Sequence, residues 1–218
     1  MSKLCRPKTS MAGRAGRANF RRAEVSFEGE RVVIWFLSSL AIVLVVGDFG
    51  STFLYHVPQH LWFKLHLRTH HDRTRSYWDH AIVSQDPWIL LDGLLGALPY
   101  ILIAAGLSLL GPAWMAGAVA GLVLGQAHVW WRHTCEIGWV SPSWLVRLSR
   151  TFALVLPEDH NGHHQNPDVE FGDLFRFYDA PARAMLTYVR TWQRRRRTAL
   201  KRLHRIHALR TLRNAQQA

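Results

Sequence analysis

The sequence contains two cysteines in 218 residues, and this scarcity excludes two kinds of structure. Cys5 and Cys135 lie far apart, and Cys5 is in a polar N-terminal segment, so the chain cannot form a framework of disulfide bonds. A reducing compartment is therefore the simpler assumption. A metal site built from several thiolates is excluded for the same reason. The N-terminal segment also lacks the apolar stretch of a signal peptide.

Acidic residues are absent from residues 183–218, which carry eleven lysines and arginines. Residues 1–31 carry eight basic residues against three glutamates, whereas residues 32–182 have a net charge of −4. The formal charge of +12 therefore belongs to the two ends of the chain. Nucleic-acid-binding domains usually place basic residues on a folded face, so we expect no nucleic acid partner. Basic ends around an apolar centre are typical of a membrane protein.

Three long apolar runs occupy the centre of the sequence, at residues 32–55, 88–110 and 113–131. Each is close to the length of about 20 residues that crosses a bilayer as a helix. Gly111-Pro112 provides a turn between the second and third runs, which we expect to form a hairpin. The sequence thus predicts an all-α, polytopic membrane bundle with three to four apolar spans and a His-rich helical cap.

The charge and hydropathy pattern divides the chain into three segments. We expect a flexible basic tail over residues 1–31, a membrane-embedded domain over residues 32–182 and a basic amphipathic helix over residues 183–218. The last segment places leucines and an isoleucine at helical spacing among arginines, a pattern suited to lying on a membrane surface.

Most of the thirteen histidines fall into groups. The groups are His56-Val-Pro-Gln-His60, His66-Leu-Arg-Thr-His70-His71 and His160-Asn-Gly-His163-His164. Histidines three or four residues apart share a helix face, so their imidazoles can converge on one cation. Imidazoles with nearby carboxylates suit Fe, Zn, Cu or Ni. Because the histidines exceed the four ligands of a structural zinc site, we expect two metal ions.

Two more histidines lie at the end of the third apolar run. His128 falls on the same helix face as Gly117, Gly121 and Gly125, a small-residue stripe where another helix can approach, so it should point into the bundle. His133 follows five residues later, about 140° around a continuous helix. The two side chains therefore cannot both face one metal ion unless the helix breaks between them.

These motifs resemble the integral-membrane fatty acid hydroxylase and sterol desaturase superfamily, whose members share three histidine boxes. The resemblance covers roughly residues 45–180. It includes Asp48-Phe49, HVPQH at 56–60, HLRTHH at 66–71 and PEDHNGHHQNPDVEFG at 157–172. His133-Thr-Cys-Glu is similar to the lone histidine that the family places between its second and third boxes.

The resemblance implies a non-haem diiron centre that uses O₂ to hydroxylate or desaturate an unactivated C–H bond. The expected substrate is lipid-like: a fatty acyl chain, sterol, carotenoid or hydrophobic natural product. Two iron ions and an external electron donor, of ferredoxin or cytochrome type, are implied with it. The enzyme would lie in a bacterial inner membrane or the endoplasmic reticulum, with its histidine boxes on the cytoplasmic face.

The candidate site residues follow from the boxes and the signatures around them. The expected metal ligands are His56, His60, His66, His70, His71, His128, His133, His160, His163 and His164. Asp48, Glu136, Asp159, Asn166 and Asp179 are candidates for orienting the imidazoles by hydrogen bonds.

Two alternatives remain open at the level of sequence. A His-rich membrane protein that binds or transports metal has the same composition, although transport sites usually lie near mid-bilayer and these boxes follow the ends of spans.

The topology also has two versions. In the first version all three runs cross, and the basic N-terminus lies outside, against the positive-inside rule. In the second version the first run bends at Gly47-Asp48 and does not cross fully, so the N-terminus stays inside.

Overall fold

The computed structural model describes residues 12–72, 74, 76–80 and 84–215. In this part of the chain every regular element is helical, and one isolated antiparallel bridge joins Leu154 to Phe175. The elements are α1 (Ala12–Gly50), η1 (Ser51–His56), α2 (Val57–Leu61), α3 (Leu65–Thr69), η2 (Tyr77–His80), α4 (Pro87–Ser108), α5 (Pro112–Arg132), η3 (Thr134–Ile137), α6 (Ser143–Thr151), α7 (Pro157–Gln165), η4 (Arg176–Tyr178) and α8 (Asp179–Ala215). The all-α prediction is confirmed.

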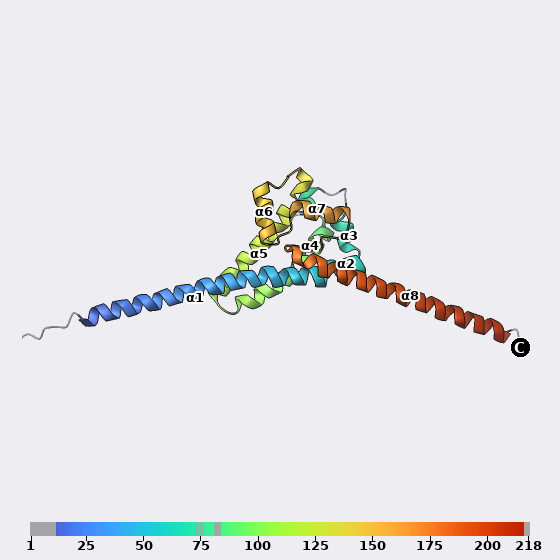
Figure 1. The fold of residues 1–218 in the computed structure, drawn as a ribbon, viewed down its shortest axis with the longest axis horizontal. Coiled ribbons are helices and arrows are strands. Elements are labelled where there is room, and N and C mark those ends of the chain that lie inside the picture. Colours follow the sequence, from blue (N-terminus) through green and yellow to red (C-terminus); the bar gives the residue numbers. More distant parts are fainter. Residues whose placement is uncertain (1–11, 73, 75, 81–83, 216–218) are drawn as a thin grey trace, which may run out of the picture.

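Helices α4 and α5 form the expected hairpin and pack along the second half of α1 (Figure 1). Small residues allow the close approach: Gly117 faces the backbone carbonyl of Phe36, and Gly121 faces the side chain of Val43. A Cβ atom at Gly117 would overlap that carbonyl. Two positions of the glycine stripe therefore form the α1–α5 contact, as small residues do in membrane helix pairs.

The first apolar run does not bend at Gly47-Asp48. Helix α1 continues through both residues to Gly50, and the π-helical turn η1 then leads into α2. Pro58 lies in the first turn of α2 and has no N–H group, and the N–H of Val57 reaches back to the carbonyl of Thr52. The π-helical turn therefore accommodates Pro58 without interrupting the helix. It also sets the directions of His56 and His60.

Two helical stretches are long and apolar enough to cross a membrane, Glu28–Leu61 and Pro87–Ser108. The third predicted span forms α5, which carries Gln126 and His128 and is not among them. Along α4 the side chains of Leu94, Leu98 and Leu102 form an exposed apolar stripe. Such a stripe is unfavourable in water and suits lipid contact.

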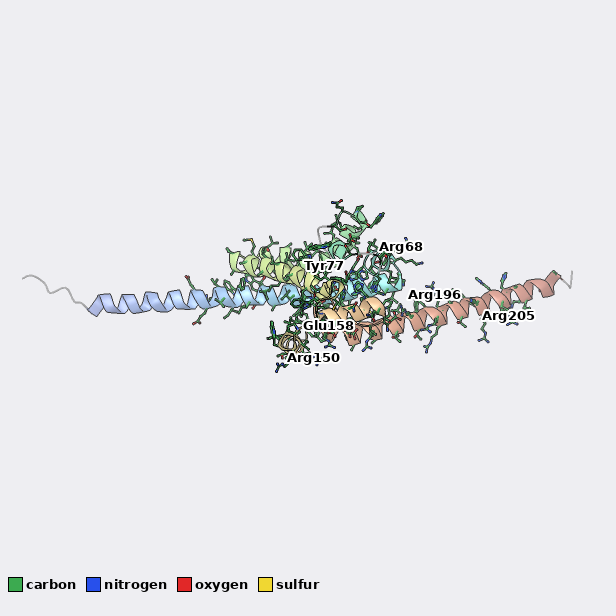
Figure 2. All side chains as sticks on the ribbon, turned by 90° about the horizontal axis from the view of Figure 1, so that it is seen from above. Arg68, Tyr77, Arg150, Glu158, Arg196 and Arg205 are labelled. Carbon is green, nitrogen blue, oxygen red and sulfur yellow. The ribbon has the colours of Figure 1, made fainter. Side chains whose placement is uncertain are left out.

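The two ends of the molecule extend away from the helical body in opposite directions (Figure 1). Residues 12–31, expected as part of a flexible tail, form the first turns of α1, and residues 1–11 of that tail lie outside the described residues. The predicted boundary at residues 182 and 183 falls inside α8. Arg196 and Arg205 project from α8 clear of the body (Figure 2).

The short helices α2, α3 and α7 gather where α4 begins and α5 ends (Figure 1). A small apolar core fixes α2 and the loop after α7 to the start of α8, because Val57 and Phe171 pack against Ala182 and Leu186. Helix α7 begins at Pro157 and contains the whole third histidine group despite Gly162. This arrangement brings all three histidine groups to one end of the bundle.

Candidate metal centre

One group of five histidines comes from three separate parts of the chain. The group, called site A here, comprises His56, His60, His66, His71 and His163. One ring nitrogen from each lies within 4.8 Å of the corresponding nitrogens of the others. All five are at least half-buried, and His163 is fully buried. Site A therefore combines all three histidine boxes.

A second group of four lies beside it. This group, called site B here, comprises His70, His133, His160 and His164. The Nε2 atom of His160 lies 3.0 Å from that of His133, 3.1 Å from that of His164 and 3.2 Å from that of His70. Site B therefore joins the lone histidine after α5 to the second and third boxes.

The two sites are immediate neighbours. The rings of His66 in site A and His70 in site B stack with their centroids 4.5 Å apart. His163 and His164 are consecutive residues on α7 and face different sites, with ring centroids 6.4 Å apart. Adjacent residues of one helix point about 100° apart, so this pair naturally serves two centres side by side.

The Nδ1 atoms of three histidines are fixed by backbone carbonyls. His56 lies 2.9 Å from the carbonyl of Phe171, and His133 lies 2.7 Å from that of Val129. His163 lies 2.5 Å from the carbonyl of Val169. A carbonyl can only accept, so each of these Nδ1 atoms carries the proton and each Nε2 atom presents a lone pair to the site.

This pattern fits metal ions. The buried Nε2 atoms of His60 and His66 have no hydrogen-bond partner among the described residues. In site B the Nε2 atoms face one another at 3.0–3.4 Å, and ligand atoms bound at about 2.1 Å to one tetrahedral ion lie about 3.4 Å apart. Converging lone pairs repel one another unless a cation lies between them.

The electrostatics of the cap also favour metal binding. Burial holds the pKa of His70, His160 and His163 well below the usual value of 6.5, and neighbouring imidazoles act in the same direction. These side chains are therefore neutral at pH 7, which is the form that binds a metal ion.

His128 belongs to neither site. Its side chain is buried as the glycine stripe predicts, but its Nε2 atom lies 3.0 Å from the carbonyl of Val155. That hydrogen bond connects α5 to Val155, two residues before α7 begins. Since α5 ends at Arg132 and His133 follows as its C-cap, the structure brings His133 and not His128 to the other histidines.

Two of the carboxylates expected to orient imidazoles act through the loop after α7. Asp48 accepts hydrogen bonds from the N–H groups of Asp173 (3.1 Å) and Phe175 (2.7 Å). Asp179 accepts one from the N–H of Phe171, at 3.1 Å. Because the carbonyl of Phe171 fixes His56, these two carboxylates position a site A histidine indirectly.

Two of the other candidates form hydrogen bonds with backbone groups at the ends of α7. Asp159 accepts from the N–H of Leu156 at the start of α7, and it pairs with Arg176 at 3.4 Å. Asn166 accepts from the N–H of Asp168 at 3.2 Å. Asp159 and Asn166 therefore support the ends of the helix that carries the third histidine group. Glu136 is exposed on η3.

Sequence reasoning missed the carboxylate that does contact a site histidine. Asp92 on α4 lies 3.2 Å from Nδ1 of His66 and accepts a hydrogen bond from the hydroxyl of Tyr55. A single charge in an apolar run is costly unless it is paired, and Asp92 is the only charge in the second run, so the signal was present.

A second buried pair supports His56. Asp173 accepts from Arg132 at 2.7 Å and from Ser51 at 2.5 Å, and its carboxylate lies 3.7 Å from Nδ1 of His56. The guanidinium of Arg132 holds the pKa of Asp173 below its usual range despite burial. Arg132 and Asp173 lie in unremarkable polar stretches of sequence, so only the fold reveals them.

A cavity of about 420 Å³ opens beside the two sites, between α4 and α5. Its wall includes site histidines from both groups, among them His56, His70 and His133. The rest is largely apolar, with side chains such as Ile89, Leu94, Ala97, Leu122 and Val129. An apolar molecule in this cavity would have one part next to the centre.

Comparison with known proteins gives one match. The family model described as fatty acid hydroxylase matches residues 40–183, which include all nine histidines of sites A and B. No curated protein and no solved structure matches the chain.

Proposed function

Because the chain belongs to the fatty acid hydroxylase family, we propose that it is a membrane-bound, O₂-dependent oxygenase with two iron ions. In this proposal it hydroxylates or desaturates an unactivated C–H bond of a lipid-like substrate. The observation that carries the proposal is the convergence of nine histidines into two adjacent groups at the end of an apolar cavity.

The proposed ligands are the members of sites A and B, and His128 is left out. Bound iron would supply the activation of O₂ and the oxidation of the substrate. Neutral imidazoles are suitable ligands because they bind iron without cancelling its charge. Three carbonyls and the carboxylate of Asp92 accept from Nδ1 atoms and keep the Nε2 atoms of four histidines aimed at the centre before a metal binds; these are His56, His66, His133 and His163.

The surroundings of the sites serve the same chemistry. His56, His160 and His163 are at most 2% exposed, so water is largely excluded from the ligand side of the centre. The cavity offers an apolar chain or ring a place beside these histidines, and its position between α4 and α5 allows entry from within the membrane. The chain's own residues thus select, hold and shield the substrate.

The membrane topology in this proposal follows from the helix directions. Helices α1 and α5 run towards the histidines and α4 runs away from them, so residues 12–27 lie at the opposite end of the bundle (Figure 1). The cap end carries the eleven basic residues of residues 183–218, against eight in residues 1–31. The positive-inside rule therefore favours a cytoplasmic cap and a translocated N-terminus.

Electrons must reach the centre from another protein, and α8 is our proposed docking element. No acidic residue follows Asp179, whereas arginines occupy four consecutive positions from Arg194 to Arg197. These side chains are exposed, and α8 leaves the body on the side of the cap (Figures 1 and 2). An acidic ferredoxin or cytochrome complements this surface.

The experiment that tests the function is metal analysis of the purified protein from cells grown with iron-57. We expect two iron ions per chain and a Mössbauer spectrum of a coupled pair. His66→Ala in site A and His160→Ala in site B should each lose iron, whereas His204→Ala on the exposed part of α8 should keep it.

The same experiment decides against the proposal if the protein holds zinc, a single ion or none after anaerobic loading with ferrous iron. A protein that exchanges metal ions across a vesicle membrane without consuming O₂ would support the metal-transport alternative. A coupled iron pair with O₂-dependent conversion of a lipid would support the oxygenase.

A further inference from the structure

The cavity beside the sites is lined along one face of α5. Leu122, Gln126 and Val129 lie three or four residues apart, and His133 continues the same stripe into site B. Gln126 and His133 are seven residues apart, which places them on one helix face with an axial separation of about 10 Å. The stripe therefore ends at His133 of site B, and Gln126 lies two helical turns before it.

Gln126 differs from the other polar side chains of the cavity wall. Ser51 donates to Asp173, and Tyr55 donates to Asp92. The remaining polar groups with partners are Thr69, Tyr100, His128, Arg132 and the site histidines. Gln126 alone makes no hydrogen bond within the part of the chain that the structure describes.

An unpaired amide in such a wall needs an explanation. An amide in apolar surroundings is unfavourable without a hydrogen-bond partner, so buried polar groups usually have one. Gln126 is half-buried, and its neighbours on the stripe are Leu122 and Val129. Polar side chains in this setting commonly mark the place where a ligand binds.

The charges around the cavity restrict what that ligand is. The cation of the wall, Arg132, already pairs with Asp173, and Asp92 adds a second carboxylate. At the Gln126 end no cationic side chain lines the cavity among the described residues. A carboxylate or phosphate there would have no counter-charge, whereas a neutral oxygen needs only the donor and acceptor of an amide.

We propose that Gln126 binds a neutral oxygen function of the substrate, such as a hydroxyl, ketone or ester, and so selects neutral oxygenated lipids over hydrocarbons and free fatty acids. This inference rests on the proposed function and names its substrate class. The cavity volume of about 420 Å³ accommodates one chain or one compact ring system. Because Gln126 lies about 10 Å along α5 from His133, the oxidised carbon is several bonds from the oxygen.

Binding of matched lipids to the purified full-length protein tests this selection without requiring turnover. The probes are methyl palmitate, its isomer heptadecanoic acid, and nonadecane, all with the same number of non-hydrogen atoms. Cholesterol and cholestane form a second pair for ring substrates. Tritiated probes in one detergent give the dissociation constants for wild-type protein, Gln126→Leu and the matched control Gln193→Leu on α8.

We expect wild-type protein to bind the oxygenated member of at least one pair more tightly than its hydrocarbon. Gln126→Leu should reduce that preference about 5–10-fold, the effect of one neutral hydrogen bond, and leave hydrocarbon binding unchanged. Gln193→Leu should behave as wild type. Iron content should be the same in all three proteins, since Gln126 contacts no site histidine.

Three outcomes would overturn the inference: an unchanged preference in Gln126→Leu, tightest binding of heptadecanoic acid, or no binding of any probe. These outcomes differ from a failure of the proposed function. A protein with a coupled iron pair and O₂-dependent turnover but an unchanged preference contradicts only the role of Gln126. A protein without iron that still shows the Gln126-dependent preference contradicts only the oxygenase.

Discussion

At the scale of single residues, the direction in which a side chain leaves its helix decides whether it serves the metal centre. His128 and His133 are separated by five residues at the end of α5, and both are buried. His133 reaches site B, whereas His128 donates to the carbonyl of Val155. Burial alone therefore does not distinguish a ligand from a structural histidine.

The first prediction concerns this pair. His133→Ala should remove a site B ligand, so the purified protein should lose at least one iron ion per chain. His128→Gln should keep both ions and lower the melting temperature, because only the contact with Val155 is weakened. Elemental analysis with thermal unfolding checks both results. Iron loss in His128→Gln with full iron in His133→Ala would reverse our assignment.

The second prediction concerns Asp92, which orients His66 from α4. Asp92→Ala should leave His66 free to rotate and lower iron affinity about 10–100-fold, the usual effect of removing such a partner. Asp168→Ala is the control, because this exposed carboxylate pairs with Arg190 and belongs to neither site. Iron competition with a chelator gives the affinities, and equal values for the two variants would contradict the orienting role.

At the scale of elements, close helix contacts position the cap. Gly117 allows α5 to lie against the backbone of α1 at Phe36, and the π-turn η1 then rotates His56 towards site A. Gly117 itself contributes no site histidine, whereas η1 ends in His56. Both set the register in which α1 and α5 deliver their histidines to the same place.

The third prediction follows from the α1–α5 contact. Gly117→Val should force the helices apart and reduce stability by about 1–3 kcal/mol, because its side chain overlaps the Phe36 carbonyl. Gly106→Ala on α4 should be neutral or stabilising by up to about 1 kcal/mol, since nothing lies within 4 Å of the new methyl group. Thermal unfolding in detergent distinguishes the two, and equal effects would contradict the close packing.

At the scale of the whole molecule, the histidine centre links stability to pH. In the metal-free protein the pKa values of His70, His160 and His163 are lowered by burial from 6.5, so the folded state keeps these side chains neutral. The unfolded chain takes up protons on them below about pH 6.5. Stability is therefore fully present above that pH and decreases as the pH falls below it.

The fourth prediction gives this link a magnitude. Between about pH 6.5 and pH 5.5 the metal-free protein should lose about 1 kcal/mol of stability per buried histidine. The variant His160→Gln should show a smaller decrease, because one of these groups is gone. Thermal unfolding across this range checks the effect, and a melting temperature independent of pH would contradict it.

The fifth prediction concerns the proposed docking helix. Replacing Arg194, Arg195, Arg196 and Arg197 by glutamine should reduce turnover with an acidic electron donor about 10-fold at low salt. Iron content and turnover with a small chemical reductant should not change, because these residues lie far from the sites. Donor-driven turnover that is insensitive to the four replacements and to ionic strength would rule out docking on α8.

The helical class of the fold and the grouping of the histidines follow from the sequence alone. The three histidine boxes, the shortage of cysteine and the apolar runs were sufficient to predict an all-helical fold and imidazoles that could hold a metal ion together, because helical spacing alone places histidines on common faces. The family match over residues 40–183 agrees with that interpretation.

Only the tertiary structure decided how the nine histidines are divided between sites A and B, because that division depends on how η1, α2, α3, α7 and the end of α5 meet. It also placed Asp92 against His66 and left Gln126 unpaired in the cavity wall, since contacts between helices far apart in sequence have no local signature. Spacing within one helix is a local property, whereas the pairing of helices is set by packing across the whole bundle.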